Sequence, residues 1–245
     1  MAPEVETLSI WVYLSASPLL GLTITLVAYN LAYRLYMRSN SNTLLNPVAT
    51  AIGSLIVFLL LTDIDYKDYF RGAQFVHFLL GPATVALAVP LYHQLPKLRT
   101  LWLPLAISII SGVVIAALCS IGIAAVLGAS PMALFSLAPK SATAPVAMGI
   151  SERIGGLPSL TAVLVVATGI IGAVTGTKLL DLLGIREDSV KGVAMGLTAH
   201  GIGTARAFQV NREMGAFSGL AMALSAFATA VILPWLVGQL GPYLR

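Results

Sequence analysis

Three basic side chains stand beside helix-breaking residues in an otherwise apolar sequence. Lys140 lies in the stretch PKSATAPVAMGIS, which also contains two prolines and three hydroxyl side chains. His200 and Arg206 flank the glycine-rich break in the stretch HGIGTAR. Broken helices leave backbone amides unpaired, and such amides bind anions together with basic side chains. These stretches therefore predict an anion site.

A third break, LLNPVATAIG, has the sequence of a helix start. Asn46 would cap a helix that begins at Pro47, and Pro145 would begin another helix in the same way, with hydroxyl side chains nearby. The positive ends of both helices would then face the site. The predicted substrate-binding residues are Asn46, Lys140, Ser141, Thr143, His200, Gly201, Gly203, Thr204 and Arg206, and the predicted helix breaks are Pro47, Gly81, Pro82 and Pro145.

Each of these residues also has a simpler interpretation. Lys140 and Arg206 can extend from helix ends to the lipid headgroups, and His200 can be a hydrogen-bonded packing residue. Proline and glycine are common in membrane helices, where they often produce only a kink. Four breaks that accompany hydroxyl and basic side chains favour a binding site over these alternatives.

The elements that position these residues are membrane helices. The chain has 245 residues, 58% of them hydrophobic and only 10% charged. A helix needs about 20 apolar residues to cross a bilayer. Uncharged stretches of this length run from 7 to 33, 39 to 62, 72 to 96, 154 to 177 and 214 to 244, and the stretch from 100 to 139, with a turn at GASP, is long enough to cross twice. With two shorter segments, we expect an all-α membrane protein of about eight segments.

Loop lengths and charges suggest how the chain is organised. The connections are short, so we expect one integral membrane domain over residues 1–245. The stretch MAPEVETLSIW has no basic segment typical of a cleavable signal, so we expect the first span to be retained. Acidic residues precede this span and Arg34 and Arg38 follow it, which favours an external N-terminus.

An internal repeat is suggested by two pairs of similar segments. NPVATAIG (46–53) resembles APVAMGIS (144–151), and GPATVALA (81–88) resembles GIGTARAF (201–208). We expect repeat halves 1–128 and 129–245 in inverted orientation, with discontinuous helices at the membrane midplane, as in secondary transporters. The segments near Asn46 and Ser141 should then lie close together at similar depth.

Several classes of function are disfavoured. The formal charge of +4 comes from scattered basic residues without any run, so nucleic acid is not an expected partner. The sequence lacks HExxH, paired metal ligands, a paired acid site and a complete dinucleotide motif, so we expect no enzyme activity, metal or cofactor. The single cysteine, Cys119, is expected to be a packing residue.

The chain also resembles a known family. The stretches LLNPVATAIG, PKSATAPVAMGIS and KGVAMGLTAHGIGTARAF are similar to those of the LrgB/CidB family, and the resemblance covers nearly all of the sequence. It implies a bacterial inner-membrane protein that often works beside a small LrgA/CidA-type membrane partner. It further implies either antiholin-like control of murein hydrolase and lysis, or transport of glycolate, glycerate or pyruvate.

Two hypotheses follow. The first is a secondary transporter of small monocarboxylates, which agrees with basic residues near the midplane and with the lack of carboxylates inside the spans. The second is an antiholin-like regulator of murein hydrolase that acts through an LrgA/CidA-type partner. We also expect a homodimer embedded in the lipid bilayer, because such transporters commonly support a moving half on a fixed one.

Overall fold

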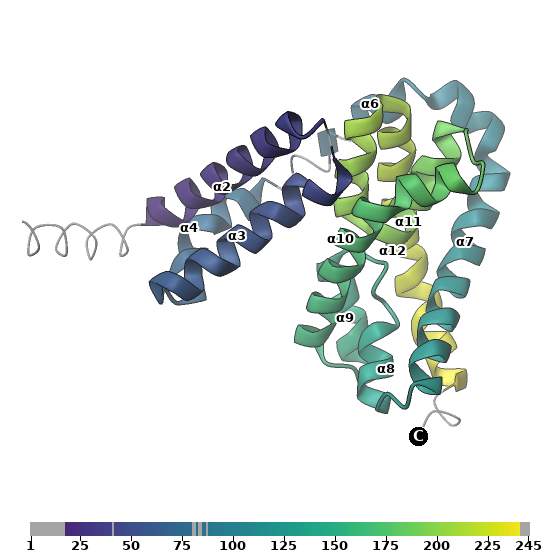
Figure 1. The fold of residues 1–245 in the computed structure, drawn as a ribbon. Helices are drawn as coiled ribbons and strands as arrows, with labels where there is room; N and C mark the ends of the chain where they lie inside the picture. Colours follow the sequence, from purple (N-terminus) through teal and green to yellow (C-terminus); the bar gives the residue numbers. More distant parts are fainter. Residues whose placement is uncertain (1–17, 41, 80–81, 83–84, 87, 241–245) are drawn as a thin grey trace, which may run out of the picture. The chain divides into compact units, whose positions relative to one another are not determined.

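The computed structural model describes residues 18–40, 42–79, 82, 85–86 and 88–240, and every element within these ranges is a helix (Figure 1). The chain divides into two compact units, residues 1–86 and 87–245, which are treated separately below. Unit 1 contains α2 (Pro18–Arg38), the short 3-10 helix η1 (Thr43–Leu45), α3 (Pro47–Thr62) and α4 (Tyr66–Phe78). Unit 2 contains α6 (Ala88–Tyr92), α7 (Leu95–Val126), α8 (Pro131–Leu137), α9 (Ala144–Ile154), α10 (Pro158–Leu182), α11 (Asp188–Val210) and α12 (Arg212–Leu240).

In unit 1, α2 packs against both α3 and α4. Gly21 allows α2 and α4 to approach closely, because a side chain there would overlap the backbone oxygen of Tyr69. The Thr25 and Tyr69 hydroxyl groups are 2.7 Å apart, so they share a hydrogen bond between the same two helices. Helix α3 begins as predicted, with Asn46 as its N-cap and Pro47 in its first turn.

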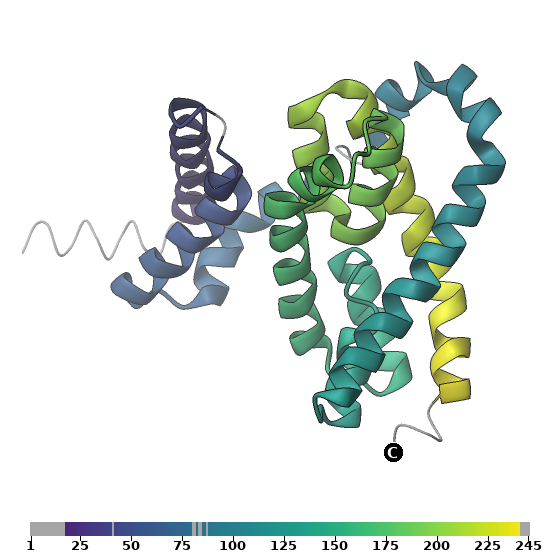
Figure 2. The ribbon, with the colours of Figure 1, turned by 45° about the vertical axis from the view of Figure 1, so that its right-hand side comes forward.

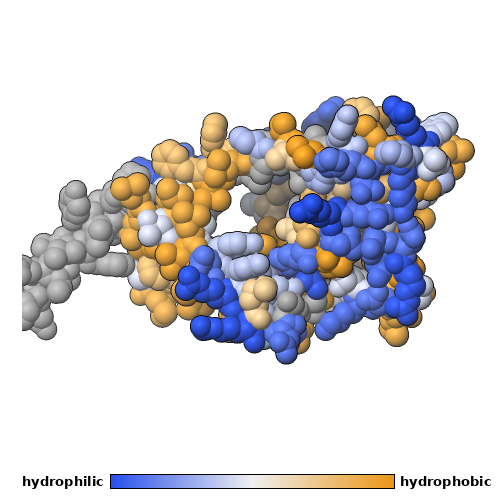
Figure 3. All heavy atoms as spheres, turned by 90° about the horizontal axis from the view of Figure 1, so that it is seen from above, coloured by the Kyte–Doolittle hydropathy of each residue, from blue (hydrophilic) through white to orange (hydrophobic). Residues whose placement is uncertain are grey.

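Three helices of unit 2 are long and apolar enough to cross a membrane, namely α7, α10 and α12. Most of their side chains are not buried inside the protein, which is the pattern expected of helices that face lipid. At the upper end of unit 2 in Figure 1, seen from above in Figure 3, hydrophilic residues gather on the surface. This end includes the start of α7 and the α10–α11 connection.

The segment between α7 and α10 forms a broken hairpin, which we call hairpin 1 (residues 131–154). Helix α8 has seven residues, the chain then leaves helical geometry at 138–143, and α9 returns over eleven residues. The prediction that residues 100–139 cross the membrane twice was wrong in its second half. Seven helical residues extend only about 10 Å, a third of the hydrocarbon thickness.

Helix α11 folds back on itself at His200 and forms hairpin 2 (residues 188–210). His200 has a non-helical backbone, with φ 41° and ψ −132°. A side chain at Gly203 would lie 2.8 Å from the backbone oxygen of Met195, although eight residues of straight helix would separate them by about 12 Å. The two arms of α11 therefore run side by side in opposite directions.

The two hairpins approach α10 from opposite ends. Near the start of α10, Thr161 bonds to the Ser136 carbonyl and the Ser151 hydroxyl group of hairpin 1. Near the other end, Leu180 packs with Met195 and Ala207 of hairpin 2. Figures 1 and 2 show the same arrangement, with α8 and α9 beside one end of α10 and α11 beside the other. Each hairpin thus packs near one end of α10, a candidate membrane-spanning helix.

The predicted number of spans and the repeat are not settled by this architecture. Three described helices are candidate spans, and α3 is a shorter apolar helix. The unit boundary at 86/87 differs from the expected repeat boundary at 128/129, and the first copies of both repeated segments begin in unit 1. The inverted repeat, the count of about eight membrane segments and the close approach of Asn46 to Ser141 therefore stay predictions.

Hairpin 2 is held against α12 by glycine contacts, and these generate a stability prediction. A side chain at Gly196 would overlap the Ser218 carbonyl, whereas one at Gly122 of α7 would meet nothing within 4 Å. We expect Gly196→Ala to destabilise the protein by about 1–3 kcal/mol, because the backbone of α12 must move. Gly122→Ala should cause no loss. Thermal unfolding midpoints in detergent check this, and equal midpoints for the two variants would contradict it.

Candidate functional site

The tips of the two hairpins meet at the middle of α10. Ala142 and Ala147 of hairpin 1 pack against Val165, and the His200 Nε2 atom of hairpin 2 lies 2.9 Å from the Val165 carbonyl oxygen. The same residue of a continuous helix thus contacts both breaks. The break before Pro145 and the break at His200, directly before the glycines where the sequence predicted an interruption, are therefore brought together within unit 2.

A pocket of about 510 Å³ lies beside this meeting point. Hairpin 1 contributes Lys140 and Ser141 to its wall, and hairpin 2 contributes Thr198. The continuous helices α7 and α10 supply the rest of the lining: Ala116, Cys119, Ser120, Ile123, Thr168, Ile171 and Gly172. We call it the Lys140 pocket.

The pocket is electropositive and polar on one side. Lys140 is its only charged lining residue among those that the structure describes, and its ammonium group lies 3.5 Å from the Ser141 hydroxyl. Helix α9 starts directly after this segment, so its positive end is at the tip of hairpin 1. Thr143 is the N-cap residue, but its side chain does not bond to the first turn. The arrangement suits a small anion.

His200 holds the tip of hairpin 2 in place. Its ring is buried beside Gly169, where a side chain would come within 2.6 Å of the His200 Cε1 atom. A positive φ is costly for a residue other than glycine, by about 1–3 kcal/mol. The hydrogen bond to Val165 and the tight fit against Gly169 stabilise this conformation. His200 therefore has a structural role at the edge of the site.

The other predicted residues of hairpin 2 lie along its returning arm. The Thr204 hydroxyl donates to the His200 carbonyl at 2.8 Å and lies 2.9 Å from the Ser218 hydroxyl of α12. Gly203 permits the two arms to touch. Arg206 is buried, and its Nη1 atom donates to Gln209 at 3.3 Å. Gly201, Gly203, Thr204 and Arg206 are not among the residues that line the Lys140 pocket.

The remaining predicted residues lie at helix starts. The Asn46 side-chain oxygen accepts hydrogen bonds from the amides of Val48 and Ala49 at 3.0 and 3.2 Å, which confirms the predicted cap. Pro145 lies in the first turn of α9 and is exposed. Pro82 is helical and exposed, and Gly81 lies outside the described residues.

Sequence reasoning missed the pocket residues that come from unbroken helices. Ser120, Thr168 and Cys119 lie on α7 and α10, where no proline, glycine pair or charge distinguishes them from packing residues. Cys119 is exposed and not part of the core. The available signal was on α10, where the small and hydroxyl residues Thr161, Thr168 and Gly172 recur at helical spacing and so share one face of the helix.

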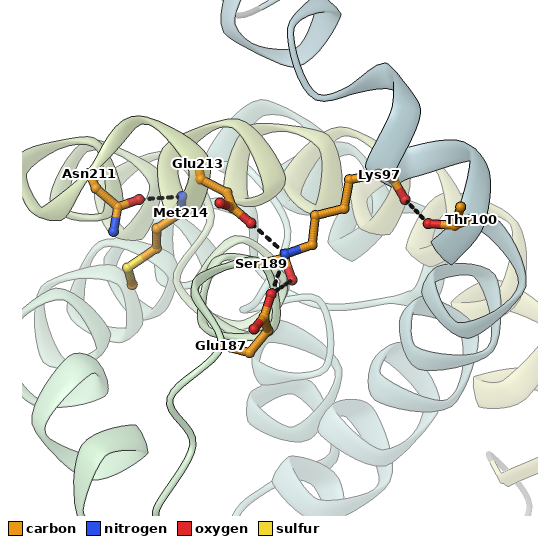
Figure 4. Close-up of polar contacts among 7 residues, drawn as sticks. All are labelled: Lys97, Thr100, Glu187, Ser189, Asn211, Glu213 and Met214. Atoms are coloured by element: carbon orange, nitrogen blue, oxygen red, sulfur yellow. Dashed lines mark hydrogen bonds and ion pairs between the residues drawn. The ribbon is translucent and has the colours of Figure 1, made fainter.

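A second polar cluster lies at the hydrophilic end of unit 2. Lys97 at the start of α7 reaches between Glu187, the N-cap residue of α11, and Glu213 in the first turn of α12 (Figure 4). The Lys97 Nζ atom is 2.6 Å from a Glu213 carboxylate oxygen. The hydrogen bond from Lys97 lowers the pKa of the Glu187 carboxyl group. This cluster ties α7 to the base of hairpin 2.

The described residues contain no group of three or more His, Cys, Asp or Glu side chains that could hold a metal ion. Three helices long and apolar enough to cross a membrane, together with two broken hairpins that meet beside a pocket with one basic residue, indicate an integral membrane protein.

Comparison with known proteins identifies the family. Residues 25–238 match the LrgB-like family, so the chain belongs to it. It is 32% identical to the holin-like protein CidB of Staphylococcus epidermidis over 92% of this chain and 97% of that protein. It is 29% identical to the antiholin-like protein LrgB of Bacillus mycoides, over 92% of this chain and 98% of the relative. No solved structure matches it.

The strained backbone of His200 generates a prediction about glycine. His200→Ala loses the hydrogen bond to Val165 and keeps the unfavourable φ, whereas His200→Gly relieves that φ. We expect His200→Gly to be more stable than His200→Ala by about 1 kcal/mol. At Gln209, in the regular part of α11, the order should be reversed by about the same amount. Thermal unfolding of the four variants tests this, and the same order at both positions would contradict it.

Proposed function

We propose that the protein is a secondary membrane transporter of small monocarboxylates, of the glycolate, glycerate or pyruvate type, with its substrate site in the Lys140 pocket. The observation that carries the proposal is the position of Lys140 at the tip of a broken hairpin, where it lines a pocket together with hydroxyl side chains. Ionisable groups at membrane depth are functional candidates by default. Among the described lining residues no carboxylate accompanies Lys140, which favours an anion as the ligand.

The chemistry of the pocket supports a small substrate with one negative charge. One ammonium group balances one carboxylate, and Ser141, Ser120 and Thr198 supply hydroxyl groups for a second oxygen. The volume of about 510 Å³ lies within the usual range for small-molecule sites. Discontinuous helices at the midplane are the usual substrate-binding elements of secondary transporters.

The approach of the two hairpins from opposite ends supports alternating access. One hairpin packs near each end of α10, so movement of either one would change access to the pocket from that end of unit 2. We further propose a location in the bacterial inner membrane with an external N-terminus, a homodimer, and a separate LrgA/CidA-type protein as a possible partner.

A second candidate function is antiholin-like regulation of murein hydrolase activity and lysis through that partner. The names of the relatives, a holin-like protein and an antiholin-like protein, agree with this candidate better than with transport. A protein with this function would act through a surface that binds the partner, and it would need no substrate pocket. The two functions would coexist if transport through the pocket controlled the lytic response.

Uptake measurements separate the candidates. Purified protein in lipid vesicles should take up labelled glycolate or pyruvate with saturation kinetics if it is a transporter. Vesicles without protein provide the background. A protein that acts only through interactions would show no saturable uptake, and that result would exclude the proposed transport function.

Substitution of Lys140 is the direct test of the site. Lys140→Met removes the charge that binds the carboxylate, so we expect KM to rise by about 10- to 100-fold, as for the loss of a hydrogen bond to a charged group. Arg186→Gln, which removes an exposed charge between α10 and α11, should leave KM unchanged. Both variants must be compared at equal amounts of folded protein. Wild-type KM in Lys140→Met would place the substrate elsewhere.

Arg206 tests how far the site extends along hairpin 2. It does not line the Lys140 pocket, so in place of the direct binding of substrate that the sequence predicted, we propose that its guanidinium group stabilises hairpin 2. We expect Arg206→Gln to lower stability by about 1–3 kcal/mol, because it removes the contact with Gln209 and other buried packing. The KM of the folded fraction should stay near the wild-type value. A raised KM in Arg206→Gln and Arg206→Lys at unchanged stability would instead make Arg206 a substrate ligand.

A further inference from the structure

The Lys140 pocket is open on one side. Four of its lining residues are exposed, namely Cys119, Ile123, Ile171 and Thr198. A small ligand therefore reaches the pocket without any opening movement of the helices. The strong hydrogen-bonding side chains among the described lining residues are one ammonium group and four hydroxyl groups, and their donors and acceptors decide which acid fits.

Two of the hydroxyl groups have already used their hydrogen atoms. The Ser120 hydroxyl donates to the Ala117 carbonyl of α7 at 3.0 Å. The Thr198 hydroxyl donates to the Ala194 carbonyl of hairpin 2 at 2.7 Å. A hydroxyl group has one hydrogen to donate and two lone pairs with which to accept. Ser120 and Thr198 therefore present hydrogen-bond acceptors to a ligand.

The other polar side chains of the pocket present donors. Lys140 donates one ammonium hydrogen to the Ser141 oxygen at 3.5 Å, which leaves two ammonium hydrogens and the Ser141 hydrogen available. The Thr168 hydroxyl of α10 makes no hydrogen bond within the described part of the chain, so its hydrogen is also available. A carboxylate accepts at about four positions on its two oxygen atoms. These donors therefore suit the carboxylate of the ligand.

The combination of donors and acceptors distinguishes acids by the group beside the carboxylate. A 2-hydroxy acid carries a hydroxyl hydrogen there, which Ser120 or Thr198 can accept. A 2-oxo acid carries a carbonyl oxygen, whose lone pairs would face the lone pairs of these two side chains. To donate to that oxygen, either hydroxyl would have to break its present bond to the helix. An acceptor that loses water and gains no donor costs free energy, so the 2-oxo acid should bind more weakly.

We propose that Ser120 and Thr198 are specificity-determining residues, which make the Lys140 pocket selective for small 2-hydroxy acids over the corresponding 2-oxo acids. The proposal rests on the proposed function, because it takes the Lys140 pocket as the substrate site. It narrows the glycolate, glycerate or pyruvate type of substrate to the hydroxy acids. Hairpin 1 then binds the carboxylate, while α7 and the arm of hairpin 2 before His200 read the neighbouring hydroxyl group.

Competition binding to the purified protein tests this selectivity. Labelled glycolate is displaced by unlabelled lactate or pyruvate, which share one carbon skeleton and one charge and differ only at the second carbon. The two enantiomers of lactate are measured separately, and the tighter one is compared with pyruvate. We expect it to displace glycolate at a concentration about tenfold lower than pyruvate, as for one hydrogen bond whose partner is otherwise left unpaired.

Substitutions assign the preference to the two hydroxyl groups. Thr198→Val keeps the shape of the side chain and removes one acceptor, and Ser120→Ala removes the other. The preference for lactate should fall in each variant and disappear in the double variant. Thr175→Val is the matched control, because the exposed Thr175 hydroxyl also donates to its own helix, at 2.7 Å from the Ile171 carbonyl, but does not line the pocket. Its preference should equal that of the wild type.

The measured quantity is a ratio of two acids on one sample, so it does not depend on the amount of folded protein. Equal displacement by lactate and pyruvate in the wild type would overturn the proposal. An equal loss of preference in Thr175→Val and Thr198→Val would do the same. Failure of the wild type to bind labelled glycolate would also overturn it, because the pocket would then not be a site for hydroxy acids.

Uptake by the same protein in lipid vesicles distinguishes this proposal from the proposed function. Displacement of glycolate requires no transport, whereas uptake does. If lactate displaces glycolate better than pyruvate but uptake is not saturable, the specificity stands and the transporter assignment fails. If uptake is saturable and pyruvate competes as well as lactate, the transporter assignment stands and the specificity is wrong.

Discussion

The structure of unit 2 depends on one constraint, namely that backbone amides and carbonyls at membrane depth must find partners inside the protein. A bare peptide group in lipid costs several kcal/mol, so a broken helix is stable there only when protein or a wet cavity surrounds it. Hairpin 1 leaves helical geometry at 138–143, and hairpin 2 does so at His200. Both breaks are enclosed by α7, α10 and α12, and the polar pocket lies where they meet.

Hydroxyl side chains and glycines satisfy this constraint with little volume. The Ser136 hydroxyl of hairpin 1 accepts a hydrogen bond from the Leu157 amide at 2.8 Å, and the Thr204 hydroxyl donates one to the His200 carbonyl at the turn of hairpin 2. At Gly196 the backbone of hairpin 2 approaches the backbone of α12 closely, so that short hydroxyl side chains can bridge the two elements. The polar residues of the hairpins therefore have two separate roles, since some hold the breaks together and a smaller group lines the pocket.

The breaks were predictable from the sequence, but their geometry was not. Proline and glycine beside hydroxyl groups have local effects, so the cap at Asn46 and the interruptions before Pro145 and at His200 could be read from neighbouring residues. The reversal of α11 depends on a contact between Met195 and Gly203, which local spacing does not encode. The short α8 was missed because an apolar run of residues has the same composition whether it crosses the bilayer or enters a protein interior. Likewise, Thr168 becomes a pocket residue only through the packing of hairpins on α10.

The charge of Lys140 explains how such a site could select its ligand. An ammonium group at membrane depth is costly, and in the described part of the chain no carboxylate forms an ion pair with Lys140. Hydroxyl groups and the positive end of α9 do not offset that charge. An anion would, so its binding relieves a cost that the empty pocket carries, whereas a cation would increase it. A neutral molecule of the same shape gains only hydrogen bonds. The proposed selectivity for anions over neutral compounds would thus follow from the cost of keeping the half-buried Lys140 charged, without any contact that recognises one particular acid.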